Sequence, residues 1–222
     1  MGLTGFFLIT FLIVHCGINS MIFFNDGGET FNHWGHFMGS NLIIRTMEIG
    51  LFLFLLLHIV QGLMLWSQNN AARPIKYGVN KAEKNSKWYS RSMGLLGTLI
   101  LMFLVMHLYH FWVPSRFGGM ANIHALEPIT LGTEYANQEA HNLYREMQLV
   151  FQDNLFVVIV YVLGVISLCW HLLHGFQSAF QTFGINHKRY TPLIKTIGVV
   201  YSVVICLLFA LMPVSIYMNW IS

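Results

Sequence analysis

Five long apolar stretches constrain the fold of this 222-residue chain more than any other feature. At about 1.5 Å per residue, each is long enough to cross a hydrocarbon core of about 30 Å as an α-helix. Only 9% of the residues are charged, against roughly 25% in an ordinary soluble domain. We therefore predict an all-α integral membrane protein, a single membrane domain over 1–222, with transmembrane helices near 2–23, 43–66, 93–113, 155–176 and 194–219.

The basic residues are distributed unevenly. Six of the twelve lie between the second and third stretches, and three lie between the fourth and fifth or at the start of the fifth. Most acidic residues lie in the other connections. The positive-inside rule then predicts a multi-pass protein of the cytoplasmic membrane with a cytoplasmic N-terminus. The first stretch has no basic flank or cleavage site, so we expect a transmembrane helix rather than a signal peptide. The nine residues are Arg73, Lys76, Lys81, Lys84, Lys87, Arg91, Lys188, Arg189 and Lys195.

Tryptophan and tyrosine gather at the ends of the stretches, where amphipathic rings suit the headgroup region. The outer connections, 24–42 and 114–153, are predicted to contain short interfacial helices, the first with an apolar stripe. The residues at the ends of the stretches are Trp66, Trp88, Tyr89, Trp112 and Trp220, and those of the stripe are Phe31, Trp34, Phe37 and Met38.

Four histidines lie at matching depths in four of the stretches: His15, His58, His107 and His171. Neutral imidazoles inside a bilayer are costly to place, and they are the usual axial ligands of non-covalently bound haem. The cysteines form no CxxC or CxxCH motif, which disfavours iron–sulfur ligation and covalent haem attachment. The pattern therefore predicts a cytochrome b with two haem b groups.

An internal repeat relates the two halves of the chain. MGLTGFFLITFLIVH, ending at His15, aligns without gaps on MGLLGTLILMFLVMH, ending at His107. The second helix of each half carries HxxxG, which places Gly62 and Gly175 four residues after His58 and His171. Residues i and i+4 share a helix face, so each glycine would let a flat macrocycle approach the backbone beside its ligand. The alternative is ordinary small-residue helix packing.

Depth predicts how the histidines pair. Each lies in the last third of its helix, and successive helices run in opposite directions. His15 and His107 should then lie in the outer leaflet, and His58 and His171 in the inner leaflet, with the two layers about 13 Å apart at 1.5 Å per residue. Two alternatives stay open. His110 lies one turn beyond His107, and His174 lies one turn beyond His171, so either residue of each couple could face the bundle.

Together these segments resemble the five-helix, di-haem cytochrome b subunit that anchors succinate dehydrogenase and quinol:fumarate reductase, respiratory complex II, in menaquinone-using bacteria. The resemblance covers nearly the whole chain and rests on FLIVH, GGETFNHWGHFMGSN, LLLHIVQG, FLVMHLYHFW and CWHLLHGFQSAFQTFGI in this order and spacing.

The resemblance implies that His15 and His107 bind the outer haem and that His58 and His171 bind the inner haem. It also implies an iron–sulfur subunit and a flavoprotein subunit on the cytoplasmic face, with menaquinone as the quinone substrate and a higher oligomer of the complex as a candidate state. Some related fumarate reductases carry a glutamate two residues before the fourth ligand, where this chain has Cys169. That departure favours succinate oxidation.

Further polar residues are candidates for contacts with quinone and with haem propionates. A quinone site needs a titratable group near a haem, and the first outer connection contains Glu29, His33 and His36. The alternative is that these three are solvated loop residues that bind nothing. Propionate candidates are Arg45, Arg91 and Lys195, with Arg45 also placed for an ion pair with Glu48 three residues on.

Two other interpretations compete. One is the cytochrome b of a hydrogenase or formate dehydrogenase, which the identity of the redox partner would distinguish. The other is a haem-free transporter or scaffold whose buried histidines relay protons or pack, and it predicts a colourless protein. In each case the surroundings are membrane lipid, and we expect no nucleic-acid partner.

Overall fold

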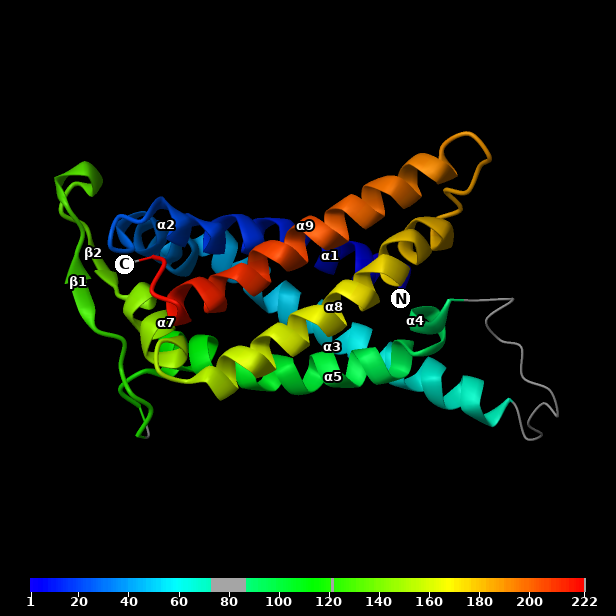
Figure 1. Ribbon diagram of the computed structural model, residues 1–222, viewed down its shortest axis with the longest axis horizontal. Coiled ribbons are helices and arrows are strands. Elements are labelled where there is room, and N and C mark those ends of the chain that lie inside the picture. Colours follow the sequence, from blue (N-terminus) through cyan, green and yellow to red (C-terminus); the bar gives the residue numbers. More distant parts are fainter. Residues whose placement is uncertain (73–86, 121, 222) are drawn as a thin grey trace.

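The computed structural model describes residues 1–72, 87–120 and 122–221, and Figure 1 shows a bundle of long helices capped at one end by shorter elements. Five segments are long and apolar enough to cross a membrane, which confirms the predicted all-α, multi-pass architecture. They are Gly2–Phe24 (α1 and the 3-10 turn η1), Leu42–Ala71 (α3), Met93–Phe117 (α5, η3 and α6), Leu155–Thr182 (α8) and Thr191–Tyr217 (α9).

Each spanning segment overlaps its predicted range, and the main differences are at the ends. The more polar segments 67–71 and 177–182 continue α3 and α8 beyond their most apolar portions, because a helix that leaves the hydrocarbon still satisfies its backbone internally. The third segment is continuous but contains one π-helical turn, η3 (Leu108–Trp112), between α5 (Met93–His107) and α6 (Val113–Phe117). Such π-turns are frequent at functional sites.

Helix α8 is the centre of the bundle. It packs against α1, α5 and α9, and its buried side chains recur at the three- and four-residue spacing of a helix face, among them Val158, Tyr161, Val165, Leu172 and Phe176. Helix α3 is the opposite case, because none of its residues is buried although it contacts α1 and α5. The bundle is therefore tight around α8 and loose around α3.

The shorter elements form a cap over one end of the bundle, which we call the cap end (Figure 1). The cap contains α2 (Glu29–Ser40), strands β1 (Pro128–Thr130) and β2 (Glu139–His141), the 3-10 turn η4 (Thr133–Tyr135) and α7 (Leu143–Phe151). The fully buried Asn32 joins them, since its amide oxygen accepts from the backbone N–H of Tyr144 at 3.0 Å and its Nδ2 donates to Asn142 at 3.1 Å.

The cap agrees only in part with the predicted interfacial helices. α2 and α7 lie within the expected segments, but the antiparallel pairing of β1 with β2 was not foreseen. Three-residue strands are too short to show an alternating pattern. Of the predicted stripe on α2, Phe31 is buried in the cap, whereas Trp34 and Phe37 remain exposed.

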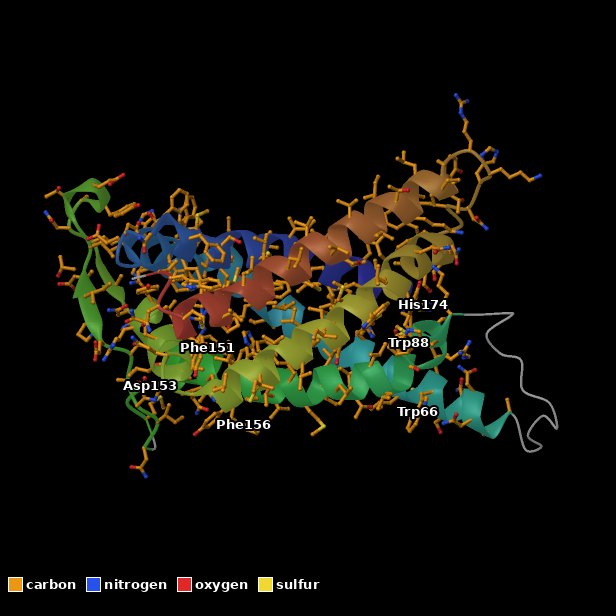
Figure 2. The ribbon with its side chains drawn as sticks, viewed as in Figure 1. Trp66, Trp88, Phe151, Asp153, Phe156 and His174 are labelled. Atoms are coloured by element: carbon orange, nitrogen blue, oxygen red, sulfur yellow. The ribbon has the colours of Figure 1, made fainter. Side chains whose placement is uncertain are left out.

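The opposite end, which we call the basic end, holds the N-terminus, the α8–α9 turn and the four-residue helix α4 (Trp88–Arg91), while the C-terminus lies at the cap end (Figure 1). Trp66 and Trp88 also lie at the basic end (Figure 2), as the prediction of aromatic residues at helix ends requires. The described basic residues here are Lys87, Arg91, Lys188, Arg189 and Lys195, whereas Arg73, Lys76, Lys81 and Lys84 lie outside the described residues.

Candidate functional site

Two histidines from α1 and α5 face each other near the cap end. The ring centroids of His15 and His107 are 5.8 Å apart, and the ring planes are inclined at 85°. The aromatic side chains that contact this cap-end pair come from four helical segments and are Phe11, Phe103, Phe111, Tyr161 and Phe209. The cap-end pair is thus enclosed by apolar rings within the bundle.

A second pair joins α3 to α8. The ring centroids of His58 and His171 are 6.1 Å apart at 68°, and His58 Nδ1 lies 3.1 Å from the hydroxyl of Thr4, near the start of α1. From Thr4 to His15 along α1 is about 16 Å at 1.5 Å per residue. This basic-end pair and the cap-end pair therefore lie in two layers, and their membership is the one that helix depth predicts.

The spacing within each pair suits a metal ion between two imidazoles. A coordinating imidazole nitrogen lies about 2 Å from a first-row metal, so the ring centroids of two opposed ligands are about 6 Å apart. The observed separations of 5.8 and 6.1 Å are close to that distance, which also falls within the roughly 4.5–7 Å of ordinary aromatic ring contacts. Among the described residues, His, Cys, Asp and Glu form no group of three or more that could hold a metal ion, so the arrangement is one of pairs.

The Nδ1 atoms differ between the two halves of the chain. In each pair one histidine has a polar neighbour at Nδ1: the amide nitrogen of Asn19 lies 3.3 Å from His15, and Thr4 lies beside His58. The Nδ1 atoms of His107 and His171 are buried and have no hydrogen-bond partner. Buried polar atoms without partners are costly, so both layers carry the same uncompensated feature.

The two HxxxG glycines have few close neighbours. A Cβ built on Gly62 would meet only the Met1 methyl, at 3.7 Å, and one on Gly175 would meet only the ring of His171, at 4.0 Å. By contrast, a Cβ on Gly164 would lie 2.6 Å from Phe103, and one on Gly198 would lie 2.7 Å from Phe176. Close helix packing therefore explains the latter glycines but not those beside His58 and His171.

The neighbouring histidines point elsewhere. His110 stacks on Tyr161, with 5.9 Å between ring centroids, and its Nδ1 lies 2.9 Å from the tyrosine hydroxyl. His174 is half-buried near the basic end (Figure 2), while His171 on the same helix faces His58. The geometry thus selects His107 and His171 for the two pairs.

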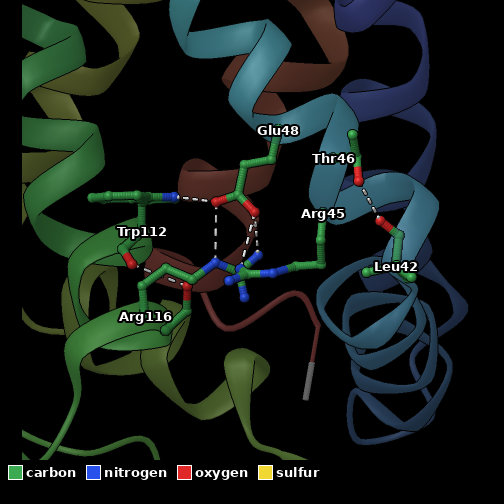
Figure 3. Close-up of polar contacts among 7 residues, drawn as sticks. Leu42, Arg45, Thr46, Glu48, Trp112 and Arg116 are labelled. Carbon is green, nitrogen blue, oxygen red and sulfur yellow. Dashed lines mark hydrogen bonds and ion pairs between the residues drawn. The ribbon is translucent and has the colours of Figure 1, made fainter.

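Glu48 is the centre of a polar cluster that joins α3 to the end of the third spanning segment (Figure 3). Its carboxylate accepts hydrogen bonds from Arg45, from both Nε and Nη2 of Arg116, and from the indole of Trp112 at 2.6 Å. The predicted Arg45–Glu48 ion pair is confirmed, at 3.0 Å. Sequence reasoning missed Arg116 and Trp112, because their contact with Glu48 depends on packing between helices.

The other propionate candidates lie at the basic end. Arg91 ends α4 and Lys195 lies in the first turns of α9, and both are exposed. A role at the basic-end pair stays a prediction for both.

The three candidate quinone residues separate in the structure. Glu29 lies against the backbone of Gly132, and His33 stacks on Tyr135 while its Nδ1 contacts Gln138 at 3.0 Å. These two residues hold the β1–β2 connection onto α2.

Only His36 of the three lines the cleft of about 220 Å³ that lies between α2, the third spanning segment and β2. The residues around it are Gly35, His36, Gly39, Ser40, Ser115, Leu126, His141 and Leu143. His141 and Ser115 could not be found from the sequence, because they enter the cleft from segments that are distant along the chain.

Asp26 fixes the start of α2 in the cap. Its carboxylate accepts from the backbone N–H groups of Gly28 at 3.1 Å and Thr30 at 3.0 Å. Burial by itself raises the pKa of Asp26, but the hydrogen bonds from Thr30 and Gly28 outweigh it and hold the pKa below its ordinary value.

Searches among protein families, characterised proteins and solved structures found nothing that matches this chain. The fold, a five-span membrane protein, follows from the structure, and the function rests on the geometry of the two histidine pairs.

Proposed function

We propose that this chain is a di-haem cytochrome b that anchors a succinate:quinone oxidoreductase in the membrane. It would transfer electrons between an iron–sulfur subunit, itself joined to a flavoprotein, and menaquinone. One observation carries the proposal: four histidines from four helices form two contacting pairs in separate layers, with ring separations of 5.8 and 6.1 Å.

The residues of each pair fit a bis-histidine haem. His15 and His107 would hold one haem, and His58 and His171 the other, where haem supplies reversible one-electron transfer. Thr4 would orient the ring of His58 by accepting a hydrogen bond from its Nδ1–H, a role that such outer contacts commonly serve at metal sites. Gly62 and Gly175 leave room beside their ligands.

The cleft at the cap end supports a quinone headgroup site. Its volume of about 220 Å³ is below the roughly 300–1,000 Å³ of pockets that enclose whole drug-sized ligands, so it suits a ring rather than an entire isoprenoid quinone. His36 from α2 and His141 from β2 would donate hydrogen bonds to the quinone oxygens, and Ser40 and Ser115 add further hydroxyl groups.

The first experiment is a reduced-minus-oxidised spectrum with pyridine haemochrome quantification on the purified chain. We expect two b-type haems per chain. A colourless protein would overturn the proposal and favour a transporter or scaffold.

Single variants then test the ligand set. His58→Ala or His171→Ala should remove the basic-end haem, and His15→Ala or His107→Ala the cap-end haem, which halves the haem content in each case. The matched controls are His174→Ala and His110→Ala, which should retain both haems. Loss of haem in the controls with retention in the four variants would contradict the assignment.

The partner is tested separately by co-purification from native membranes. Co-purification of a flavoprotein and an iron–sulfur protein, with succinate-dependent reduction of the haems, would support complex II. Haems that respond to hydrogen or formate instead would assign the chain to a different oxidoreductase.

A further inference from the structure

Two arginines at the cap end converge on one carboxylate. Arg45 from α3 and Arg116 from the third spanning segment both donate to Oε2 of Glu48, each at 3.0 Å (Figure 3). Arg116 also donates through Nε to Oε1, and that oxygen accepts from the indole of Trp112 as well. An ionised carboxylate has about four acceptor positions, so these contacts fill those of Glu48.

The cluster carries an excess of positive charge. Two guanidinium groups share one carboxylate, and among the described residues no other acidic side chain forms an ion pair with either arginine. The side chain of Arg45 is 43% exposed, and only its Nη1 bonds Glu48. Because a guanidinium has five N–H donors, most of those of Arg45 can donate to a further acceptor. A second anion at this point would therefore be stabilised.

Both arginines lie where a spanning segment ends. Arg45 is in the first turn of α3, and Arg116 is in the last turn of Met93–Phe117, so both are at the edge of the hydrocarbon core, where lipid headgroups begin. The rest of this side of the chain is mostly acidic, and its other arginine, Arg145, is exposed and contacts Gln148. The positive charge is thus concentrated at headgroup depth.

An apolar stripe runs along α3 from this cluster towards the basic end. Four exposed apolar residues follow Arg45 at three- and four-residue spacing, so they share its helix face. They are Ile49, Leu53, Leu56 and Val60. From Ile49 to Val60 is about 16 Å at 1.5 Å per residue, close to half of a hydrocarbon core of about 30 Å. The stripe therefore has the length of one lipid leaflet, with an arginine at its headgroup end.

We propose that Arg45 and Arg116 bind the phosphate of an anionic phospholipid, and that its acyl chains lie along the stripe on α3. Guanidinium groups bind phosphate oxygens through parallel N–H groups, and basic side chains at helix ends attract anionic headgroups. Glu48 holds the two guanidinium groups in place before the lipid arrives, which lowers the entropic cost of binding. The lipid also gives contacts to α3, none of whose residues is buried.

The test is native mass spectrometry of the purified chain, released from nanodiscs that contain equal amounts of phosphatidylglycerol and phosphatidylcholine. We expect the protein to retain phosphatidylglycerol in preference to phosphatidylcholine, and Arg45→Gln should reduce this preference by about fivefold. Arg45→Gln leaves the bonds from Arg116 and Trp112 to Glu48 in place. Arg145→Gln removes an exposed arginine outside the cluster and is the matched control.

The measurement needs no haem, so its result is independent of the proposed function. Equal retention of the two lipids, or the same preference in Arg45→Gln as in the native protein, overturns the inference. Displacement of phosphatidylglycerol by inorganic phosphate would show that the site takes a free anion. A dimer that excludes lipid would show that a second copy of the chain covers the stripe. Loss of the cap-end haem in Arg45→Gln, with unchanged lipid retention, would assign Arg45 to a haem propionate instead.

Discussion

The two histidine pairs share one geometry but sit in different surroundings. The cap-end pair is enclosed by aromatic rings and lies beneath the cap formed by α2, the β1–β2 pair and α7. The basic-end pair depends on α3, a helix with no buried residue, and within the described residues its rings stack on no aromatic side chain outside the pair. Similar spacing between paired histidines therefore occurs both in a well-packed core and beside α3, which has no buried residue.

The difference predicts which helix depends most on the cofactor. A group bound between His58 and His171 would add contacts to α3 that the protein itself lacks, whereas α9 has many buried residues of its own. Removing haem should raise amide exchange in α3 by about tenfold or more while changing α9 little. Hydrogen exchange on haem-loaded and haem-depleted protein in nanodiscs measures this. Equal changes in both helices would break the comparison.

The sparse surroundings of Gly62 and Gly175 give the next largest expected effect. Gly62→Leu or Gly175→Leu should displace the basic-end haem and leave the cap-end haem, because the added side chain fills space that no other residue occupies closely. Haem per chain should fall by about half. Val60→Leu, at an exposed position of α3, is the control. Unchanged haem content in both glycine variants would favour a purely structural role.

A smaller effect is expected at the hydrogen bond behind His58. Thr4→Val removes the hydroxyl that lies 3.1 Å from Nδ1 and should weaken binding of the basic-end haem by about tenfold. The cap-end haem should be unaffected. Haem titration of the depleted protein compares Thr4→Val with Thr10→Val, whose hydroxyl bonds only the backbone of its own helix. Equal affinities would show that Thr4 does not orient the ligand.

The smallest effect sharpens the role of the cap. Asp26→Asn should destabilise the start of α2 by about 0.5–1 kcal/mol and leave the basic-end pair unchanged. Because the pKa of Asp26 is depressed in the folded protein, its stabilisation is present above the unfolded pKa and is lost as pH falls through the folded pKa. Hydrogen exchange of α2 measures both effects, with Asp153→Asn as the control.

The sequence predicted those parts of the molecule that repeat or follow a single period. Long apolar runs specify membrane helices, the gapless repeat and the HxxxG motifs selected the four histidines, and helix depth paired His15 with His107 and His58 with His171, whose rings are 5.8 and 6.1 Å apart. These predictions are possible because the position of a residue along a helix sets its depth in the membrane.

What the sequence could not predict depends on contacts between distant segments. The bonds from Arg116 and Trp112 to Glu48, the entry of His141 into the cleft and the pairing of His124 with Glu146 all join residues from different elements. The candidate quinone group was divided for the same reason, since only packing decides that His33 supports the hairpin while His36 faces the cleft.

The repeat has a consequence for biogenesis. Each histidine pair takes one member from each half of the chain, α1 with α5 and α3 with α8. A chain released from the ribosome after its first two spans would hold half of each centre and complete neither. If the proposed haems bind, their insertion acts as a checkpoint for synthesis, since only a chain that has placed its fourth span can close both pairs.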